Sequence, residues 1–123
     1  MAQHNDFGNQ AEELAASYLL GKGYEILARN FRWQKAEIDI IAGFGSKIII
    51  VEVKARGTDL FLEPHEAVNK KKIRNLVEAA NHYLEENNRA EEVRFDIISV
   101  LPDEKGKLKI THIEDAFDAF DAN

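Results

Sequence analysis

The sequence predicts a mixed α/β fold, of the α/β or α+β class, built around one sheet. Two segments carry apolar residues at helical spacing, one near the N-terminus and one in the second half of the chain. Five shorter segments are rich in β-branched and aromatic residues, which is typical of strands. The elements therefore follow the order α-β-β-β-α-β-β, with a short C-terminal helix as a further predicted element.

Length and composition indicate one domain spanning residues 1–123. The chain has no cysteine, which excludes disulfides and thiolate metal sites. The first ten residues are polar and lack the apolar core of a signal peptide. The longest apolar run, 48–51, is too short to cross a membrane. We therefore expect a cytoplasmic protein that does not associate with membranes.

The net charge of −6 argues by itself against a nucleic-acid partner. The charge is unevenly distributed, because segment 21–74 contains 11 Lys or Arg residues against 7 Asp or Glu residues. Both ends of the chain are acidic. The middle of the chain could therefore form a local basic face, although the composition does not require one.

The first half of the chain predicts one helix and three antiparallel strands. Along the helix, residues 6–22, Glu12 lies beside the edge of the apolar stripe, whereas Glu13 points to solvent. Strands are predicted for residues 24–31, 37–42 and 47–54. Gly43 to Ser46 tolerate the dihedral angles of a turn between the second and third strands.

The second half begins with a predicted loop, residues 57–64. A longer helix follows, from Pro64 or Glu66 to Glu86, and basic residues crowd its first turns. Strands are predicted for 94–101 and 108–113, and a short helix for 114–120. We expect the last helix to pack Phe117 and Phe120 inward.

Three charged residues lie inside the central apolar hairpin, namely Asp39, Glu52 and Lys54. Side chains alternate faces along a strand, so Glu52 and Lys54 share a face. On the second strand, Asp39 lies on the face opposite to that of Ile38 and Ile40. If Ala42 pairs with Lys47, all three charged side chains lie on one face. A one-residue slip of this register would separate them.

Such a cluster has a recognisable chemistry. Mg²⁺ prefers oxygen ligands, which Asp39 and Glu52 supply, and a nearby backbone carbonyl, with Val53 as the candidate, adds another. A bound metal lowers the pKa of a water and neutralises phosphate charge. Lys54 could orient that water or stabilise negative charge, and Glu12 could complete the outer shell. This combination indicates phosphodiester hydrolysis.

Each of these residues also has a plainer interpretation. Glu52 and Lys54 could form an ion pair on a solvated face, and Glu12 could be a solvated helix residue. Trp33 could stack a nucleobase, but packing in the core or within the hairpin is the commoner role of such an aromatic. The histidines have no metal-ligand spacing, so we predict no zinc site. Phosphate contacts are predicted for a basic group: Arg56, Lys70, Lys71, Lys72 and Arg74.

The combined pattern resembles the YraN family of the PD-(D/E)XK nuclease superfamily over roughly residues 8–100. The segments that carry the resemblance are GNQAEELAASYLLGKGYEILARNFR, AEIDIIA, VEVKAR, HEAVNKKKIRNLVEAANHYL and RFDIISV. The resemblance implies a restriction-endonuclease-like α-β-β-β-α-β core, with a mixed sheet flanked by helices and an extra C-terminal strand. One departure is Ala36, where the family usually has glycine.

The resemblance also implies roles for individual residues. Asp39 matches the metal-binding aspartate, Glu52 and Lys54 match the Glu-x-Lys pair, and Glu12 matches the helix glutamate. A nuclease of this kind would use Mg²⁺ or Mn²⁺ and act on DNA. The similarity to Holliday-junction resolvases implies branched or structured DNA, whose resolution calls for a homodimer. The alternatives are a non-catalytic nucleic-acid-binding or adaptor module and a protein-interaction domain.

Overall fold

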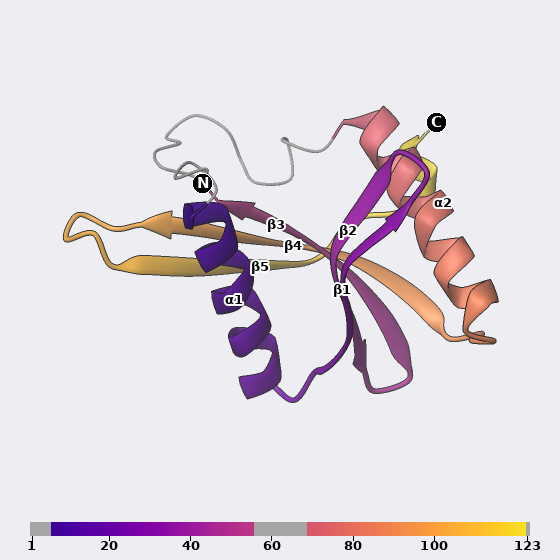
Figure 1. The fold of residues 1–123 in the computed structure, drawn as a ribbon, viewed down its shortest axis with the longest axis horizontal. Helices are drawn as coiled ribbons and strands as arrows, with labels where there is room; N and C mark the ends of the chain where they lie inside the picture. Colours follow the sequence, from indigo (N-terminus) through magenta and orange to yellow (C-terminus); the bar gives the residue numbers. More distant parts are fainter. Residues whose placement is uncertain (1–5, 56–68, 123) are drawn as a thin grey trace.

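The computed structural model describes residues 6–55 and 69–122, which form a five-stranded sheet flanked by two helices (Figure 1). The predicted α/β class and element order are confirmed. The elements are α1 (Asp6–Gly21), β1 (Glu25–Trp33), β2 (Ala36–Phe44), β3 (Lys47–Ala55), α2 (Lys70–Glu86), β4 (Glu92–Pro102), β5 (Leu108–Phe117) and the 3-10 helix η3 (Ala119–Ala122).

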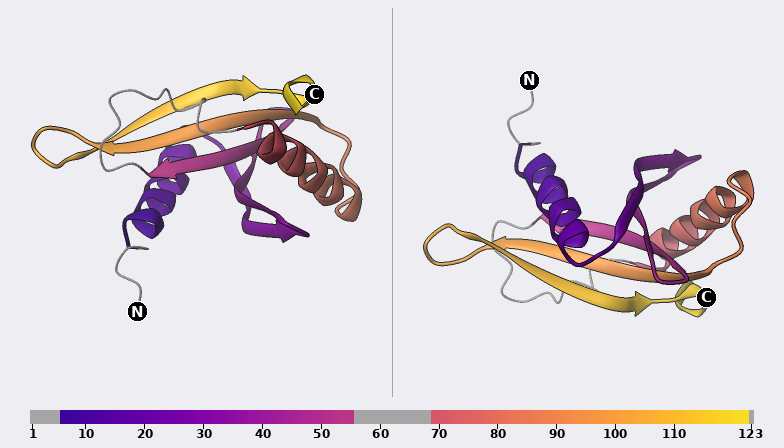
Figure 2. Two further views of the ribbon diagram at one scale, coloured as in Figure 1. Left: turned by 90° about the horizontal axis from the view of Figure 1, so that it is seen from above. Right: turned by 90° about the horizontal axis from the view of Figure 1, so that it is seen from below.

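The sheet is mixed and has the strand order β1-β2-β3-β4-β5. Neighbouring strands are antiparallel except β3 and β4, which run parallel. Their paired residues extend from Lys47, opposite Glu92, to Ala55, opposite Val100. Parallel neighbours need a long crossover, and α2 lies within the connection that joins these two strands. The sheet is strongly twisted, and the β4–β5 hairpin extends past α1 (Figure 2).

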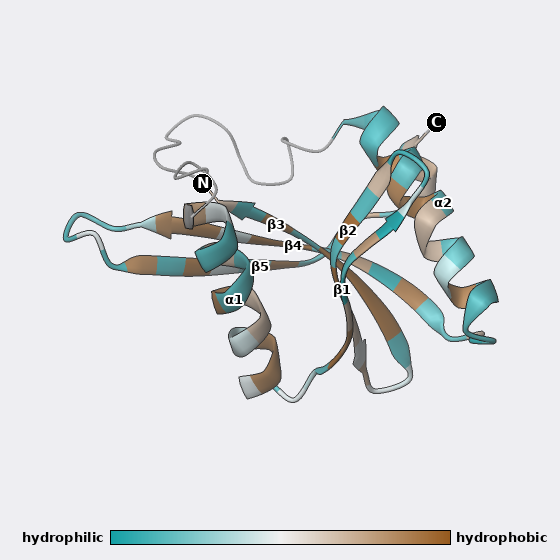
Figure 3. Ribbon diagram, in the orientation of Figure 1, coloured by the Kyte–Doolittle hydropathy of each residue, from teal (hydrophilic) through white to brown (hydrophobic). Residues whose placement is uncertain are grey.

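Both faces of β3 are buried, which explains its nearly continuous apolar sequence. Ile48 and Ile50 belong to the core cluster under α2, whereas Ile49 and Val51 belong to the cluster under α1. Figure 3 shows hydrophobic stretches along the strands of the sheet, whereas the first turn of α2 is hydrophilic. No helix in the described ranges is long and apolar enough to span a membrane.

Helix α2 starts later than the predicted Pro64 or Glu66. Asn69 has an extended backbone (ψ 173°), and its side chain accepts a hydrogen bond from the backbone N–H of Lys72. An asparagine in this role is a typical N-cap, so the helix begins at Lys70. The predicted loop, 57–64, lies outside the described residues.

The predicted helix at 114–120 is wrong. Strand β5 continues to Phe117, which lies opposite Phe95 across a register shift, and only a 3-10 turn follows. Asp115 adopts a positive φ of 53°, and its backbone N–H donates to the buried Asp96 carboxylate. Phe117 is buried, as expected, whereas Phe120 is 83% exposed, contrary to expectation.

Strands β1 and β2 are distorted together at Asn30 and Asp39. Asn30 has a φ of 54° and lies between the paired residues Arg29–Ile40 and Phe31–Ile38, opposite Asp39. Asparagine tolerates this left-handed conformation better than most residues. On β2, Ile38 packs in the α2 cluster and Ile40 in the α1 cluster. The expectation that both isoleucines share the face opposite Asp39 is therefore wrong, because the strand changes face at Asp39.

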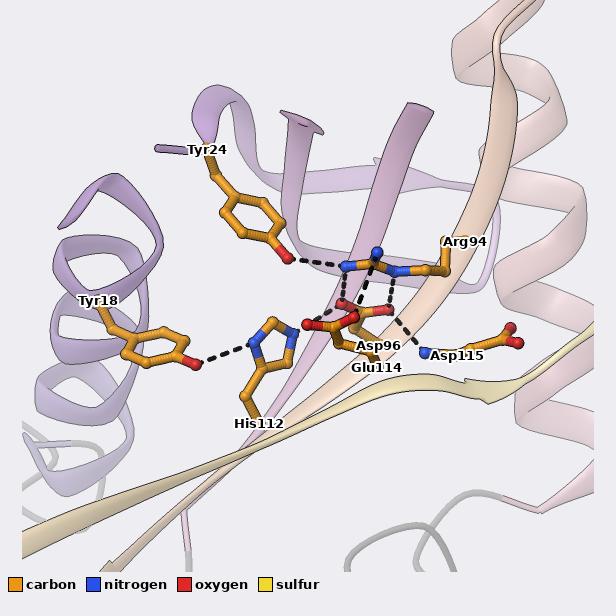
Figure 4. Close-up of polar contacts among 7 residues, drawn as sticks. All are labelled: Tyr18, Tyr24, Arg94, Asp96, His112, Glu114 and Asp115. Carbon is orange, nitrogen blue, oxygen red and sulfur yellow. Dashed lines mark hydrogen bonds and ion pairs between the residues drawn. The ribbon is translucent and has the colours of Figure 1, made fainter. Parts of the chain in front are cut away.

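A buried ionic network centres on Asp96 of β4, whose side chain is inaccessible to solvent (Figure 4). Arg94 donates to both carboxylate oxygens, at 2.9 and 2.8 Å, and His112 Nε2 lies 2.7 Å from Oδ2. Burial raises the pKa of Asp96, but the hydrogen bonds from His112 and Arg94 outweigh it, so the pKa lies below its usual value. Asp96 is therefore a buried, fully partnered carboxylate.

The same network attaches α1 to the sheet. Because a carboxylate only accepts hydrogen bonds, His112 Nε2 carries a proton, and in the neutral ring Nδ1 accepts from the Tyr18 hydroxyl at 3.1 Å. Tyr18 lies on α1, and Tyr24, just after α1, accepts a hydrogen bond from Arg94 at 2.8 Å (Figure 4). The network thus helps to position the helix that carries Glu12.

Asn30→Val tests the strain at the β1 kink. Valine cannot adopt a positive φ without cost, so we expect the free energy of unfolding to fall by about 1–2 kcal/mol in urea denaturation. Asn30→Gly should retain stability to within about 0.5 kcal/mol, because glycine adopts this conformation freely. An equal loss for both variants would show that the Asn30 side chain, and not the backbone, matters.

Asp96→Asn tests the buried network. The variant leaves Arg94 without its buried carboxylate partner, so that only the exposed Glu114, at 3.5 Å, remains, and we expect unfolding at pH 7 to become easier by about 3 kcal/mol. Since folding lowers the Asp96 pKa, its stabilisation is complete above the unfolded pKa, about 3.9, and is lost as pH falls through the folded value. The wild type should therefore lose stability more steeply than the variant below pH 4. Parallel acid limbs in denaturant titrations would contradict this assignment.

Candidate active site

The pairing of β2 with β3 is shifted by two residues from the predicted register. Gly45, with a φ of 60°, and Ser46 form the turn, so Phe44 pairs with Lys47 and Ala42 with Ile49. The predicted pairing of Ala42 with Lys47 is wrong. Because the shift is even, it preserves which side chains share a face. The paired residues end at Ile40–Val51, directly before Asp39 and Glu52, and the charge of Glu52 acts on Asp39.

Asp39 lies where β2 separates from β3. The paired residues end at Ile40–Val51, and in a regular ladder Val53 would next pair with Ile38. Instead, the Asp39 side chain accepts the Val53 backbone N–H through Oδ2 at 2.8 Å. The N–H and C=O groups of one strand residue point to the same edge. The Val53 carbonyl is therefore directed toward the β2 side of the strand, as a metal ligand at this position would require.

Glu52 is a buried carboxylate, 4% exposed, that contacts two lysines. Lys54 Nζ lies 3.4 Å from Glu52 Oε2, and the Lys72 ammonium contacts the same oxygen. Lys54 comes from β3 and Lys72 from the first turn of α2. The site therefore joins two strands and a helix, and burial of Glu52 disagrees with the interpretation of a solvated ion pair.

Glu12 and Glu13 lie on α1 as predicted. The Glu12 side chain is 23% exposed and the Glu13 side chain 71%. Both pair with Arg29 of β1, at 3.9 and 3.0 Å respectively. Burial raises the pKa of Glu12, and the charge of Glu52 acts in the same direction, whereas Arg29 lowers it. Glu12 is thus half-buried on α1, where the charge of Glu52 still raises its pKa, and it lies beside a cation of its own.

The strongest electrostatic perturbation is at Asp39. Burial and the neighbouring charge of Glu52 raise the pKa of Asp39 to about 8, and the hydrogen bond from Val53 only partly offsets them. The half-buried Asp39 and the buried Glu52 repel each other when both are ionised. A cation between them would relieve that repulsion, so the electrostatics fit a site for a positively charged ligand.

The lysines have opposite perturbations. Burial lowers the pKa of Lys54, and the ammonium of Lys72 lowers it further. For Lys72, burial again lowers the pKa, but the contacts with Glu52 outweigh it and the pKa is raised. A lysine whose pKa is lowered gives up a proton more readily, which suits a group that handles a proton during a reaction.

The donor set fits a hard divalent cation. Asp39 and Glu52 provide carboxylate oxygens, and Val53 provides a carbonyl oxygen. Within ranges 6–55 and 69–122, no three His, Cys, Asp or Glu side chains lie close enough together to hold a metal ion. A cation here would therefore take two carboxylates and complete its shell with backbone and water oxygens, as Mg²⁺ commonly does.

The predicted phosphate-contacting residues do not form one rim. Lys70 and Lys71 are exposed at the start of α2, whereas Lys72 contacts Glu52 inside the site. Arg74 donates to the Ala122 carbonyl oxygen at 3.2 Å. Arg56 lies outside the described residues. The sequence analysis thus missed that Lys72 contacts Glu52. A signal was available, because lysines in the first turn of a helix interact unfavourably with the helix dipole, and this turn contains no acidic residue to compensate them.

Comparison with known proteins identifies relatives over nearly the whole chain. The sequence model described as Uncharacterised protein family UPF0102 matches residues 11–100. A UPF0102 protein of Christiangramia forsetii is 52% identical over 117 residues, which cover 95% of this chain and 98% of the relative. Relatives from Flavobacterium psychrophilum and Phocaeicola vulgatus are 48% and 44% identical over 95% of this chain, and over 98% and 96% of their own lengths.

Asp39→Asn tests the repulsion between the carboxylates. Asparagine can still accept the Val53 N–H but carries no charge, so in EDTA at pH 7 we expect the free energy of unfolding to rise by roughly 0.5–2 kcal/mol. Because folding raises the Asp39 pKa, the wild type loses stability as pH rises from about 4 to about 8, and the gain should grow over that window. A destabilised variant, or a gain independent of pH, would contradict this electrostatic interpretation.

Proposed function

We propose that this chain, which belongs to the UPF0102 family (the YraN family of the sequence resemblance), is a divalent-metal-dependent endonuclease that hydrolyses DNA phosphodiester bonds. The observation that supports this most is the meeting of Asp39 and Glu52 across the diverging ends of β2 and β3, with two lysines on Glu52. A half-buried and a buried carboxylate that repel each other cost stability, so a purely structural role does not account for them.

Asp39, Glu52 and the Val53 carbonyl would hold Mg²⁺ or Mn²⁺. When bound, the cation supplies two effects, neutralisation of phosphate charge and a lowered pKa for a bound water. The chain's own residues do the rest. Asp39 keeps its orientation through the Val53 N–H, and the burial of Glu52 limits the access of bulk water to its carboxylate.

The two lysines have distinct roles in this proposal. Lys54, whose pKa burial lowers, is the group that orients the attacking water or takes its proton. Lys72 keeps its charge through contact with Glu52 and stabilises negative charge on the phosphate oxygens. Glu12 supports the outer shell from α1, with Arg29 limiting the local excess of negative charge.

DNA is the substrate in this proposal because the site adjoins the exposed Lys70 and Lys71, which suit a phosphate backbone. The resemblance to resolvases favours branched or structured DNA. Cutting both strands of a junction requires two active sites, so a homodimer belongs to this proposal.

We expect cleavage of branched or flap DNA in Mg²⁺ or Mn²⁺, and its loss in site variants. Glu52→Gln, Lys54→Met and Lys72→Met should each lower the cleavage rate by roughly 100-fold or more. The first removes a metal ligand's charge, the second removes the group that orients or deprotonates the water, and the third removes a positive charge beside the phosphate. The measurement is a gel assay of labelled junction, flap and linear DNA under single-turnover conditions. The matched control is Lys105→Met, a lysine exchange on the exposed β4–β5 turn, which should leave the rate unchanged.

Two outcomes would decide against the proposal. Cleavage that survives Glu52→Gln or Lys54→Met would reject the assigned site. Metal-independent DNA binding without turnover on any substrate would favour the non-catalytic nucleic-acid-binding module. Calorimetric titration with Mn²⁺ adds a readout independent of cleavage, because heat of binding should appear in the wild type and disappear in Asp39→Asn.

A further inference from the structure

A cavity of about 280 Å³ lies between the β1–β2 turn and the first turns of α2. Lys35 lines it from the turn, and Lys71, Lys72 and Asn75 line it from the helix. A second cavity of about 160 Å³ shares Lys35 and Asn75 and extends to Trp33. The two cavities therefore adjoin each other beside the tip of the β1–β2 hairpin, and we call them together the groove.

The first cavity is rich in cations. Three lysines line it, and its one carboxylate, Glu37, pairs with Arg32 at 3.6 Å. Glu78 lies in the second cavity, which places negative charge at the far part of the groove. The arrangement suits an anionic group held at the α2 end of the groove.

Trp33 supplies an aromatic wall in the second cavity. Its ring stacks on His82 of α2, with ring centroids 5.0 Å apart and planes inclined by 21°. The core packing that the sequence favours for Trp33 is thus present, because the residue also packs against the cluster under α2. The side chain nevertheless stays partly exposed and lines the groove, so it is held rigid beside open space.

Lys72 connects the groove to the candidate active site. It lines the first cavity, and its ammonium contacts Glu52. A chain of phosphates that passes Lys35 and Lys71 would therefore arrive at the Asp39–Glu52 cluster. The groove and the candidate active site therefore share Lys72.

We propose that this groove binds an unpaired strand of DNA, with phosphates at Lys35 and Lys71 and a base against Trp33. The inference rests on the proposed function, because it names the substrate form that the nuclease site would receive. A base inside a duplex is stacked and paired, so only an unpaired base can place its face on a protein ring. A lysine-lined groove with an aromatic wall is the usual combination for single strands. Flaps, splayed ends and junction arms supply such strands.

Trp33 is the only tryptophan of the chain, so its fluorescence reports on the groove directly. In EDTA, a 12-nucleotide single strand should quench this fluorescence, and the same sequence as a duplex should bind at least about tenfold more weakly. The double variant Lys35→Ala/Lys71→Ala should weaken single-strand binding at least about tenfold and reduce the slope of log affinity against log salt by about 1.4. Anisotropy of a labelled strand gives an independent affinity.

The matched control is Lys105→Ala/Lys109→Ala, which removes two exposed lysines near the β4–β5 turn, at the opposite end of the molecule from α2 (Figure 1). It should change affinity by less than about twofold. Equal effects of the two double variants, or equal quenching by duplex and single strand, would overturn the inference.

Binding in EDTA needs no cleavage, so the two proposals fail separately. Quenching by a single strand without metal-dependent cleavage would reject the nuclease and retain the groove. Metal-dependent cleavage that Glu52→Gln abolishes, combined with unquenched Trp33 and unchanged affinity of Lys35→Ala/Lys71→Ala, would retain the nuclease and reject the groove.

Discussion

The hydrogen bond from the Val53 N–H to Asp39 holds the site together. It replaces the backbone partner that Val53 would otherwise find on β2, so the two strands can part without leaving a donor unpaired. The separation opens the edge of β3 on which the Val53 carbonyl lies. The separation coincides with the positive φ of Asn30 on β1, opposite Asp39. At the same point of β2, Ile38 and Ile40 pack in different core clusters.

The charges at this point follow from the same geometry. Asp39 and Glu52 approach each other in a part of the sheet where water is scarce, which raises the pKa of Asp39 to about 8. Lys54 and Lys72 compensate Glu52, and Arg29 compensates Glu12. The network around Asp96 shows the contrast, since every carboxylate oxygen there has a partner and the pKa is lowered. The carboxylate of the Asp96 cluster is fully compensated, whereas Asp39 keeps an unfavourable interaction with Glu52.

Much of this arrangement could be predicted because it depends on short-range patterns. Alternation along β3 correctly placed Glu52 and Lys54 on one face, and the even register shift left Asp39 on their side. Errors arose where a single backbone conformation decided the outcome. The cap at Asn69 moved the start of α2, and the positive φ of Asp115 accompanied the continuation of β5 where a helix was expected. Apolar spacing contains no information about such positions.

The sequence alone determined the α/β class, the order of elements, and the identity of the acids and lysine in the central hairpin, because local periodicity and turn chemistry encode them. Only the tertiary structure decided that β3 and β4 run parallel, which brings α2 over the sheet and Lys72 onto Glu52. It also decided that Trp33 and Lys35 share a groove with Lys71. These contacts join residues that are far apart in the chain, and packing of the helix on the sheet, which no local pattern specifies, sets their distances.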